Sequence, residues 1–237
     1  MTVEISGLHY FDNREQANDA LAKTIAEQLS VGIESKGSSS LWCSGGSTPT
    51  ALYQTLANSE QVDWKKVLIS LVDERWVPPT DEASNERLLK QHLLTCAVEQ
   101  ASFIPFFQVT PSPEDNQAML ESELKGAVNG PLDVVVLGMG NDGHTASLFP
   151  CAKDIHQAVA KDNSNYTAVT HPEMAPHPRL TLTLNRLLAS RNIYLLLFGE
   201  DKLKTLNKAE QQGDELLMPI RYFLRNTSPA LQIYWAP

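Results

Sequence analysis

The chain contains little cysteine, no long apolar run and fewer basic than acidic side chains. Its three cysteines, Cys43, Cys96 and Cys151, lie far apart without C-x-x-C spacing, which indicates neither a disulfide framework nor a zinc site. We expect them to be buried apolar side chains in a reducing compartment. The longest apolar run, residues 193–198, is far shorter than the ~20 residues of a membrane helix, and the N-terminus lacks the pattern of a signal peptide. These absences predict a soluble, cytoplasmic protein.

The charge balance limits the partners that the protein can bind. With 19 Lys and Arg against 28 Asp and Glu, the formal net charge is −9, which disfavours nonspecific binding to nucleic acid or to an anionic membrane. An anionic small molecule would need a few focused cations. Apolar residues make up 42% and charged residues 20% of the chain, an ordinary globular composition. Residues 36–40 are expected to form a loop and not a linker, so we expect a single domain over residues 1–237.

Helical periodicity alternates with short apolar runs along the chain. This alternation predicts right-handed β-α-β units, hence an α/β fold with a mainly parallel, Rossmann-like sheet between helix layers. Ligands of such sheets bind at the carboxyl ends of strands, so we expect the chemistry just after Cys43, Val72 and Leu137. Thr48 and Pro49 are expected to cap and begin a helix. The expected helices cover residues 14–30, 49–56, 88–96, 113–128 and 200–211, and the expected strands residues 41–43, 67–72, 134–137, 166–169, 180–184, 193–198 and 231–235.

The loop after the first of these strands is Ser-Gly-Gly-Ser-Thr-Pro, residues 44–49. Gly45 and Gly46 let the backbone approach a ligand closely, and Ser47 and Thr48 add hydroxyl donors. The helix that follows offers unpaired N–H groups and a partial positive charge, so the loop suits a phosphate. The loop is not a Walker P-loop, because it does not end in Gly-Lys-Ser/Thr. The alternative interpretation is an ordinary β-to-α turn with a capped helix.

Charged residues occupy the loop expected after the second strand. Asp73, Glu74 and Arg75 stand there, followed by Trp-Val-Pro-Pro. Arg75 can contact a phosphate or a carboxylate through two parallel hydrogen bonds. A local ion pair between the arginine and one of the acids is the alternative.

The loop after the third strand, Gly-Met-Gly-Asn-Asp-Gly-His over residues 138–144, combines glycines with an acid and a histidine. Its letters fit the dinucleotide pattern G-x-G-x-x-G, but Pro150 arrives too soon for the full helix that such a site requires. A histidine can take a proton from water, so His144 is a candidate base that Asp142 could orient. A purely structural histidine is the alternative. A serine triad is disfavoured because no G-x-S-x-G motif is present.

Further residues are candidates for roles near the same edge of the sheet. Arg179 precedes an expected strand and Lys202 begins an expected helix; either cation could bind a phosphate or be a surface charge. The proline-rich segment 171–178 could form a loop over the site. His92 lies on the apolar face of its expected helix and is predicted to be a core residue. No spacing of His, Cys, Asp and Glu resembles a metal site.

Residues 44–49, 73–75 and 138–150 together resemble motifs of the 6-phosphogluconolactonase family, whose sugar-phosphate group also contains glucosamine-6-phosphate deaminases and isomerases. Residues 179–183 and 199–202 resemble later motifs of that family, so the resemblance covers nearly the whole chain. A deaminase would be expected to continue Gly-His-Ile-Ala-Phe-Asn-Glu-Pro. This chain instead continues Gly-His-Thr-Ala-Ser-Leu-Phe-Pro and lacks the Asn-Glu pair.

The resemblance implies a three-layer α/β/α fold and hydrolysis of 6-phospho-D-glucono-1,5-lactone to 6-phospho-D-gluconate in the oxidative pentose phosphate pathway. It implies no cofactor and no metal. The expected partner is a small-molecule phosphosugar lactone, with no nucleic acid and no membrane, and the protein is expected to be a monomer or weak homodimer. The hypothesis makes His144 the general base and Asp142 its orienting partner. The residues expected to bind substrate are Gly45, Gly46, Ser47, Thr48, Asp73, Arg75, Arg179 and Lys202.

Two other functions remain open from the sequence. A sugar-phosphate isomerase or deaminase of the same fold would need a carboxylate base, which the missing Glu after Phe149 disfavours. A non-catalytic phosphosugar sensor is disfavoured because no DNA-binding segment or basic tail accompanies the domain. Ammonia release from glucosamine-6-phosphate would identify the first, and tight binding without turnover would identify the second.

Overall fold

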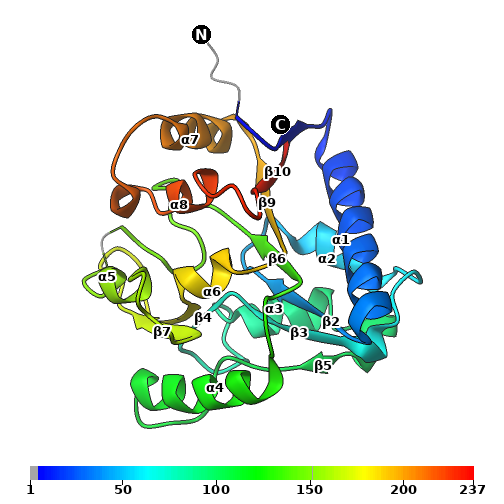
Figure 1. Ribbon diagram of the computed structural model, residues 1–237, viewed down its shortest axis with the longest axis horizontal. Helices are drawn as coiled ribbons and strands as arrows, with labels where there is room; N and C mark the ends of the chain where they lie inside the picture. Colours follow the sequence, from blue (N-terminus) through cyan, green and yellow to red (C-terminus); the bar gives the residue numbers. More distant parts are fainter. Residues whose placement is uncertain (1–4, 151) are drawn as a thin grey trace.

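A seven-stranded parallel sheet forms the centre of the molecule (Figure 1). The computed structural model describes residues 5–150 and 152–237, so the predicted burial of Cys151 falls outside the described residues. All neighbouring strands of this sheet run parallel, which confirms the predicted α/β fold class. The strands follow the order β1 (Leu8–Tyr10), β10 (Gln232–Ala236), β9 (Asn192–Phe198), β6 (Val134–Leu137), β2 (Ser39–Cys43), β3 (Val67–Leu71) and β5 (Ser102–Phe103).

The direction in which the sheet grows reverses between β2 and β6. From β2 the chain adds β3 and β5 on one side, and it then returns to add β6, β9 and β10 on the other. β2 and β6 pair directly, with Leu41 opposite Val134. In an open parallel sheet such a reversal leaves a crevice at the carboxyl ends of the two strands, where ligands bind. The topology therefore brings the residues after Cys43 and after Leu137 to one crevice.

Helices cover both faces of the central sheet. β6 is Val-Val-Val-Leu and all of its side chains are buried, which requires apolar cover on each side. On one face α1 (Arg14–Lys36) contacts β2, β6 and β10, and α2 (Thr50–Ala57) packs against α1. On the other face α7 (Glu200–Glu210) contacts β9 and α8 (Ile220–Leu224), as Figure 1 shows.

A second, three-stranded antiparallel sheet lies beside the first, and the sequence pattern does not predict it. β8 (Arg179–Leu182) stands between β4 (Asp73–Arg75) and β7 (Thr167–Thr170). The expectation of a loop at residues 73–75 is therefore wrong. An Asp-Glu-Arg run has no apolar alternation, and its strand partner comes from a distant part of the chain, so no local pattern marks this strand.

The first helix is longer than its apolar periodicity predicts. α1 continues past residue 30 to Lys36 and ends at Gly37, which has the left-handed conformation (φ 84°). β2 already begins at Ser39, so the loop expected at residues 36–40 shrinks to a short turn. Residues 34–36 are polar and exposed and Val31 is exposed as well, so the apolar pattern does not continue to the end of α1.

The second helix begins later than expected. The carbonyl oxygen of Pro49 accepts the first helical hydrogen bond, from the N–H of Tyr53 (2.9 Å). Pro49 is therefore the N-cap of α2, no side-chain hydrogen bond caps the helix, and the prediction of Thr48 as the cap is wrong. Thr48 stays in the loop, where its hydroxyl is available to the crevice.

The third helix begins and ends earlier than expected, and two predictions fail with it. α3 (Asn85–His92) ends where Leu93 leaves the helical path, so Cys96 does not share its buried face and is exposed. His92, at the last turn, is half-buried, and its Nδ1 lies 3.2 Å from Nε2 of Gln54 instead of packing in the core. Cys43 is buried as expected.

The remaining elements are short, except for one long helix. α4 (Pro113–Ala127) begins as predicted, since Oγ of Ser112 accepts the N–H of Asp115 at 3.1 Å. Among the residues that the structure describes, no helix is both long and apolar enough to cross a membrane. The short elements are α5 (Ile155–Ala158), α6 (Leu184–Leu188) and the 3-10 helices η1 (Trp64–Lys66), η2 (Cys96–Gln100) and η3 (Glu215–Leu217).

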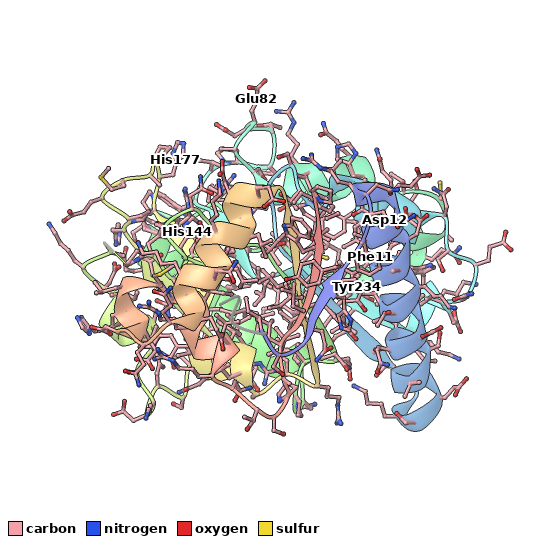
Figure 2. The ribbon with its side chains drawn as sticks, turned by 90° about the horizontal axis from the view of Figure 1, so that it is seen from above. Phe11, Asp12, Glu82, His144, His177 and Tyr234 are labelled. Atoms are coloured by element: carbon pink, nitrogen blue, oxygen red, sulfur yellow. The ribbon has the colours of Figure 1, made fainter. Side chains whose placement is uncertain are left out.

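β1 closes one edge of the sheet far from the crevice. The rings of Phe11 and Tyr234 stack with centroids 5.6 Å apart and planes 10° apart, which joins the end of β1 to β10. Figure 2 shows this pair beside α1, in a different part of the molecule from His144. The aromatic contacts of this edge therefore stabilise the sheet and take no part in the crevice.

Candidate active site

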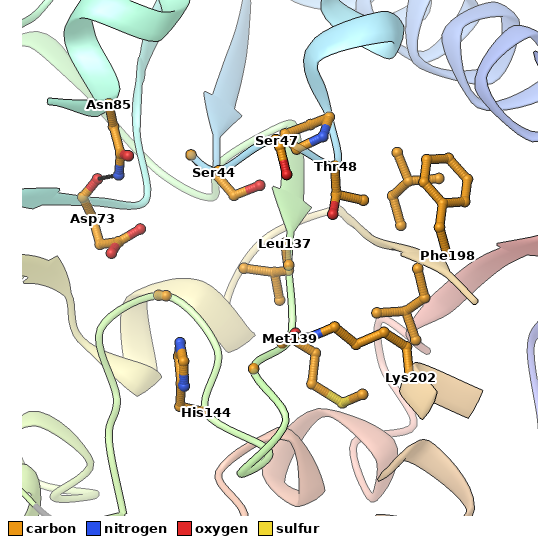
Figure 3. A pocket seen from close by; sticks show the side chains of 18 of the residues that line it. Ser44, Ser47, Thr48, Asp73, Asn85, Leu137, Met139, His144, Phe198 and Lys202 are labelled. Atoms are coloured by element: carbon orange, nitrogen blue, oxygen red, sulfur yellow. Dashed lines mark hydrogen bonds between the residues drawn. The ribbon is translucent and has the colours of Figure 1, made fainter. Parts of the chain in front are cut away.

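A cavity of about 350 Å³ opens at the crevice between β2 and β6. Its walls come from the carboxyl ends of β2, β6 and β9, from the loops that follow them, from β4 and from the start of α7. In Figure 3 the hydroxyls of Ser47 and Thr48 lie on the opposite side of the cavity from His144, and Lys202 extends in from a third side. Most residues predicted for the site line it: Gly45, Gly46, Ser47, Thr48, Asp73, Arg75, His144 and Lys202.

The loop after β2, residues 44–48, presents backbone and hydroxyl groups to the cavity; we call it the β2 loop. Gly46 has a φ of 85°, which favours glycine, and a Cβ atom there would meet open space. Gly45 allows a close approach instead, because its Cβ would lie 1.8 Å from Oδ1 of Asn85. The hydroxyl of Tyr53 donates to the carbonyl oxygen of Ser44 at 2.6 Å and fixes the start of the loop.

The loop after β6, residues 138–149, folds back around one imidazole ring; we call it the β6 loop. Nδ1 of His144 lies 2.6 Å from Oδ1 of Asp142, which also accepts the backbone N–H of His144 at 3.1 Å. Gly140 makes room for this pair, because a Cβ there would lie 2.2 Å from ring atoms of His144. Gly143 has a φ of 80° and lies against Met218. The glycines of the apparent dinucleotide pattern therefore build a turn around a histidine.

The contact with Asp142 determines which nitrogen of His144 carries the proton. Partial burial would raise the pKa of Asp142, but the hydrogen bonds and charge of His144 outweigh it, and the pKa is lowered. The carboxylate is therefore ionised at neutral pH and can only accept, so the neutral imidazole carries its proton on Nδ1. Nε2 keeps its lone pair, and the ring lines the cavity. This tautomer is the one that a general base requires.

β4 ties the β6 loop to α3. Oδ2 of Asp73 accepts the hydroxyl of Ser147 at 2.5 Å, and the carbonyl oxygen of Asp73 accepts Nδ2 of Asn85 at 2.9 Å, the bond drawn dashed in Figure 3. Arg75 also lines the cavity, and its guanidinium donates to the carbonyl oxygen of Ala83. The predicted acid and arginine are therefore held in place by specific hydrogen bonds, and not by a surface ion pair with each other.

Glu74, between these two residues, faces away from the cavity and is completely buried. Its carboxylate accepts the backbone N–H groups of Arg75, Asn85 and Glu86 and the hydroxyl of Ser84, at 2.7 to 3.0 Å. Burial raises the pKa of Glu74 to about 7, while these hydrogen bonds act in the opposite direction. The side chain joins β4 to the first turn of α3.

Lys202 lies at the cavity, as the sequence predicts. Its Nζ donates to the carbonyl oxygen of Met139 at 2.7 Å, just after β6 ends. Partial burial lowers the pKa of Lys202, and the negative charge of Asp142 opposes that shift. The amine therefore lies between the β6 loop and the start of α7.

Arg179 does not line the cavity, although it is predicted to bind substrate. Its guanidinium donates to the carbonyl oxygens of Pro176 at 2.6 Å and His177 at 3.2 Å. Burial, followed by the positive charge of Arg75, lowers the pKa of Arg179 to about 10. In this structure the side chain fixes the segment 171–178, and its role in substrate binding stays a prediction.

Among the residues that line the cavity and that the sequence analysis does not predict are Asn85 and Phe198. Asn85 lines it from α3, and the signal was a Ser-Asn-Glu helix start, in which Ser84 accepts the N–H of Arg87. Phe198 lines it as the last residue of β9, and the rule that ligands meet strand ends could have found it. Asp142, in contrast, is predicted for the site and lies behind His144 without lining the cavity.

The described residues contain few groups that could hold a metal. Within residues 5–150 and 152–237, no three His, Cys, Asp or Glu side chains are arranged as ligands. His144 and His171 each contact an aspartate through Nδ1, at 2.6 and 2.8 Å.

Comparison with known proteins identifies the family to which this chain belongs. Residues 12–235 match the family described as Glucosamine-6-phosphate isomerases/6-phosphogluconolactonase. The 6-phosphogluconolactonase of Rhizobium meliloti is 40% identical over 98% of this chain and 99% of its own, and that of Pseudomonas aeruginosa is 36% identical over 98% and 95%. The crystal structure of a 6-phosphogluconolactonase from Shewanella baltica matches with a TM-score of 0.94 and 38% identity over 100% of both chains. The chain therefore belongs to the glucosamine-6-phosphate isomerase/6-phosphogluconolactonase family.

Proposed function

We propose that the protein is a 6-phosphogluconolactonase, which hydrolyses 6-phospho-D-glucono-1,5-lactone to 6-phospho-D-gluconate with His144 as the general base. One observation carries the proposal: His144, bound through Nδ1 to Asp142, lines the same cavity as the hydroxyls of the β2 loop. A phosphosugar lactone carries its phosphate and its reacting carbonyl at separate ends. A base on one wall and an anion-binding loop on another fit both ends. The 6-phosphogluconolactonases among the relatives support the choice of substrate.

The base acts through a water molecule. Nε2 of His144 takes a proton from water while the water oxygen attacks the lactone carbonyl carbon, and the carbonyl electron pair moves to its oxygen. Asp142 holds the Nδ1 proton and stabilises the imidazolium that forms. Backbone N–H groups of the glycine-rich loops are the candidate donors to the oxyanion. When the adduct collapses, the ring C–O bond breaks, and the imidazolium returns its proton to the departing ring oxygen.

The phosphate lies at the β2 loop in this proposal. The N-terminal end of α2 contributes a partial positive charge, and Ser47 and Thr48 contribute hydroxyl donors. Lys202 supplies a full positive charge from the start of α7, and Arg75 supplies another from β4. These focused cations are what a chain of net charge −9 needs in order to bind a dianion.

The test is a pH-stat assay of acid release from freshly prepared lactone, corrected for spontaneous hydrolysis. Each turnover forms a carboxylic acid that ionises and releases one proton. His144→Ala should lower kcat by ~10²-fold or more, because general base catalysis contributes ~10²–10⁴ in rate. His156→Ala, at an exposed histidine of α5, is the matched control and should retain wild-type activity. A His144→Ala variant that keeps more than about a tenth of kcat would contradict the role of the base.

The absence of lactonase activity in the wild type would contradict the function itself. The deaminase alternative then has its own assay, because ammonia release from glucosamine-6-phosphate requires a different reaction. We expect none, since Leu148 and Phe149 stand where a deaminase would be expected to carry Asn-Glu.

We also propose that the protein acts in the cytoplasm as one domain, as a monomer or weak homodimer. The edge strands of the parallel sheet are short, since β1 has three residues and β5 has two. This supports the proposal that association is weak. Such short edges give little backbone for sheet extension into a partner. Light scattering after size exclusion tests this, and a stable complex larger than a dimer would contradict it.

A further inference from the structure

The imidazole ring of His144 is confined by more than its hydrogen bond to Asp142. The ring of Phe149 lies against it, with centroids 4.1 Å apart and planes inclined by 31°. Phe149 is only 8% exposed and does not line the cavity, so it contacts the histidine from behind. Gly140 borders the same ring atoms, where a Cβ would lie 2.2 Å away. One aromatic face and one glycine therefore limit how far the imidazole can tilt.

Phe149 is itself held in place. The residues between it and His144 form a tight turn, in which the N–H of Leu148 donates to the carbonyl oxygen of Thr145 at 3.1 Å. The guanidinium of Arg179 lies 6.0 Å from the centroid of the Phe149 ring. Because Arg179 also binds the carbonyl oxygens of the segment 171–178, the aromatic ring is fixed from β8 as well as from its own loop.

We propose that Phe149 is a positioning residue that sets the plane of the His144 ring during lactone hydrolysis; this rests on the proposed function. The Cβ–Cγ bond and the hydrogen bond at Nδ1 hold one edge of the imidazole and still allow the ring to tilt about that edge. Nε2, on the far side of the ring, would then move most. Contact with the flat face of Phe149 removes this freedom, so Nε2 keeps its direction toward the water that it deprotonates.

The same contact affects the charge that His144 acquires. When Nε2 takes the proton, the ring becomes an imidazolium, and the electron-rich face of an aromatic ring attracts a cation at this distance. Phe149 thus stabilises the protonated ring, in addition to orienting it. An aliphatic side chain of similar volume would fill the space without this attraction, which makes leucine the informative replacement.

The experiment compares Phe149→Leu with Phe149→Tyr in the lactonase assay. Phe149→Leu should lower kcat about tenfold with KM changed less than about twofold, because the ring is misdirected while the phosphate contacts remain. The acid limb of its kcat–pH profile should move down by about half a pH unit, since the imidazolium loses ~0.5–1 kcal/mol of attraction. Phe149→Tyr keeps the aromatic face and should restore both values.

A measurement that does not depend on turnover distinguishes the loss of the ring contact from misfolding of the variant. In the wild type, the ring current of Phe149 should shift the ring protons of His144 in NMR spectra, and this shift should vanish in Phe149→Leu and persist in Phe149→Tyr. Unchanged ring shifts in Phe149→Leu, or an unchanged kcat and pH profile in a variant with native circular dichroism, would overturn the proposal. An inactive wild type would instead contradict the proposed function. A Phe149→Leu variant with the kcat of the wild type, beside an inactive His144→Ala, would contradict only the role of Phe149.

Discussion

The β2 loop and the β6 loop have similar composition and solve different problems. Both follow neighbouring parallel strands, both contain two or more glycines, and both line the same cavity. In the β2 loop Gly46 meets open space, and the chain continues into α2, so the loop exposes backbone groups at a helix start. In the β6 loop Gly140 borders His144 and Gly143 borders Met218, and a tight turn follows.

This difference shows what glycine contributes at each strand end. In the β2 loop a positive φ and an unobstructed backbone favour an anion that approaches from the cavity. In the β6 loop the missing side chain provides space, and the ring of His144, the proposed base, fills that space from the same loop. A glycine pattern alone therefore does not distinguish a phosphate-binding loop from a loop that presents a base.

We expect the largest effects on kcat and KM from the substitution of one glycine in each loop. Gly140→Ala forces the His144 ring away from its position and should lower kcat by about 100-fold, because displacement of a reacting group by about 1 Å has effects of that order. Gly46→Ala strains a left-handed position beside the phosphate site and should mainly raise KM.

Gly126→Ala provides the matched control for both variants. Gly126 lies in α4, where a Cβ would meet nothing within 4 Å, so alanine should leave kcat and KM unchanged. Steady-state kinetics on the three variants test the distinction. Equal losses of kcat in Gly140→Ala and Gly46→Ala, with KM unchanged in both, would show that the two loops do not have separate roles.

Asp142→Asn removes the charge that orients His144 and should lower kcat at least tenfold. The amide can present a donor to Nδ1, which places the imidazole proton on the wrong nitrogen. Because the imidazolium also loses its neighbouring negative charge, the acid limb of the kcat–pH profile should move to lower pH. A pH-stat series from acid to neutral pH measures both effects, and an unchanged profile would contradict the assignment of the Nδ1 proton.

Lys202→Gln should act on the phosphate end alone. A hydrogen bond to a charged group contributes ~1.5–3 kcal/mol, so the loss of this cation should raise KM about tenfold or more and change kcat less. The neutral amide keeps most of the volume of the side chain and can still donate to the carbonyl oxygen of Met139. Lys204→Gln, at an exposed lysine of the same helix, is the control and should have no effect. A fall in kcat with constant KM would place Lys202 at the carbonyl end instead.

The sequence predicts the central sheet because its strands are marked by local patterns. Val134 to Leu137 and Ile193 to Phe198 are continuous apolar runs, which an α/β fold buries between helices. The position of the site follows from the same rule, since His144 and Thr48 both stand after such strands and meet at one cavity.

The second sheet and its consequences follow from contacts between distant residues. β4 consists of Asp, Glu and Arg, and its pairing with β8 places Arg75 opposite Arg179. Although paired residues share one face of a sheet, Arg179 donates to the carbonyl oxygens of Pro176 and His177 and does not line the cavity, which no pattern near residue 179 indicates. Asn85 enters the cavity for a related reason, because its position depends on its bond to Asp73.

A third segment of the cavity wall, β4, is anchored by the buried carboxyl group of Glu74 and not by a glycine. We expect the protonation of this group to affect only the stability of the protein. The pKa of Glu74 is raised by burial from its ordinary value of 4.5 to about 7, so the folded state binds the proton more tightly than the unfolded state. The stabilisation from this proton is fully present below about pH 4.5 and is lost as the pH rises through about 7. The difference of 2.5 between these values corresponds to roughly 3 kcal/mol of unfolding free energy.

Urea denaturation of the wild type and of Glu74→Gln between pH 4.5 and 7.5 (a range set by these two values) isolates this contribution. The glutamine does not titrate, so the stability of the wild type relative to the variant should decrease across the range. Glu99→Gln, at an exposed carboxylate of η2, controls for the loss of one negative charge. A constant difference between wild type and Glu74→Gln would mean that the four hydrogen bonds to the carboxylate fully offset its burial. The bonds between β4 and α3 would then be as strong in neutral as in acidic solution, and this wall of the cavity would not depend on pH.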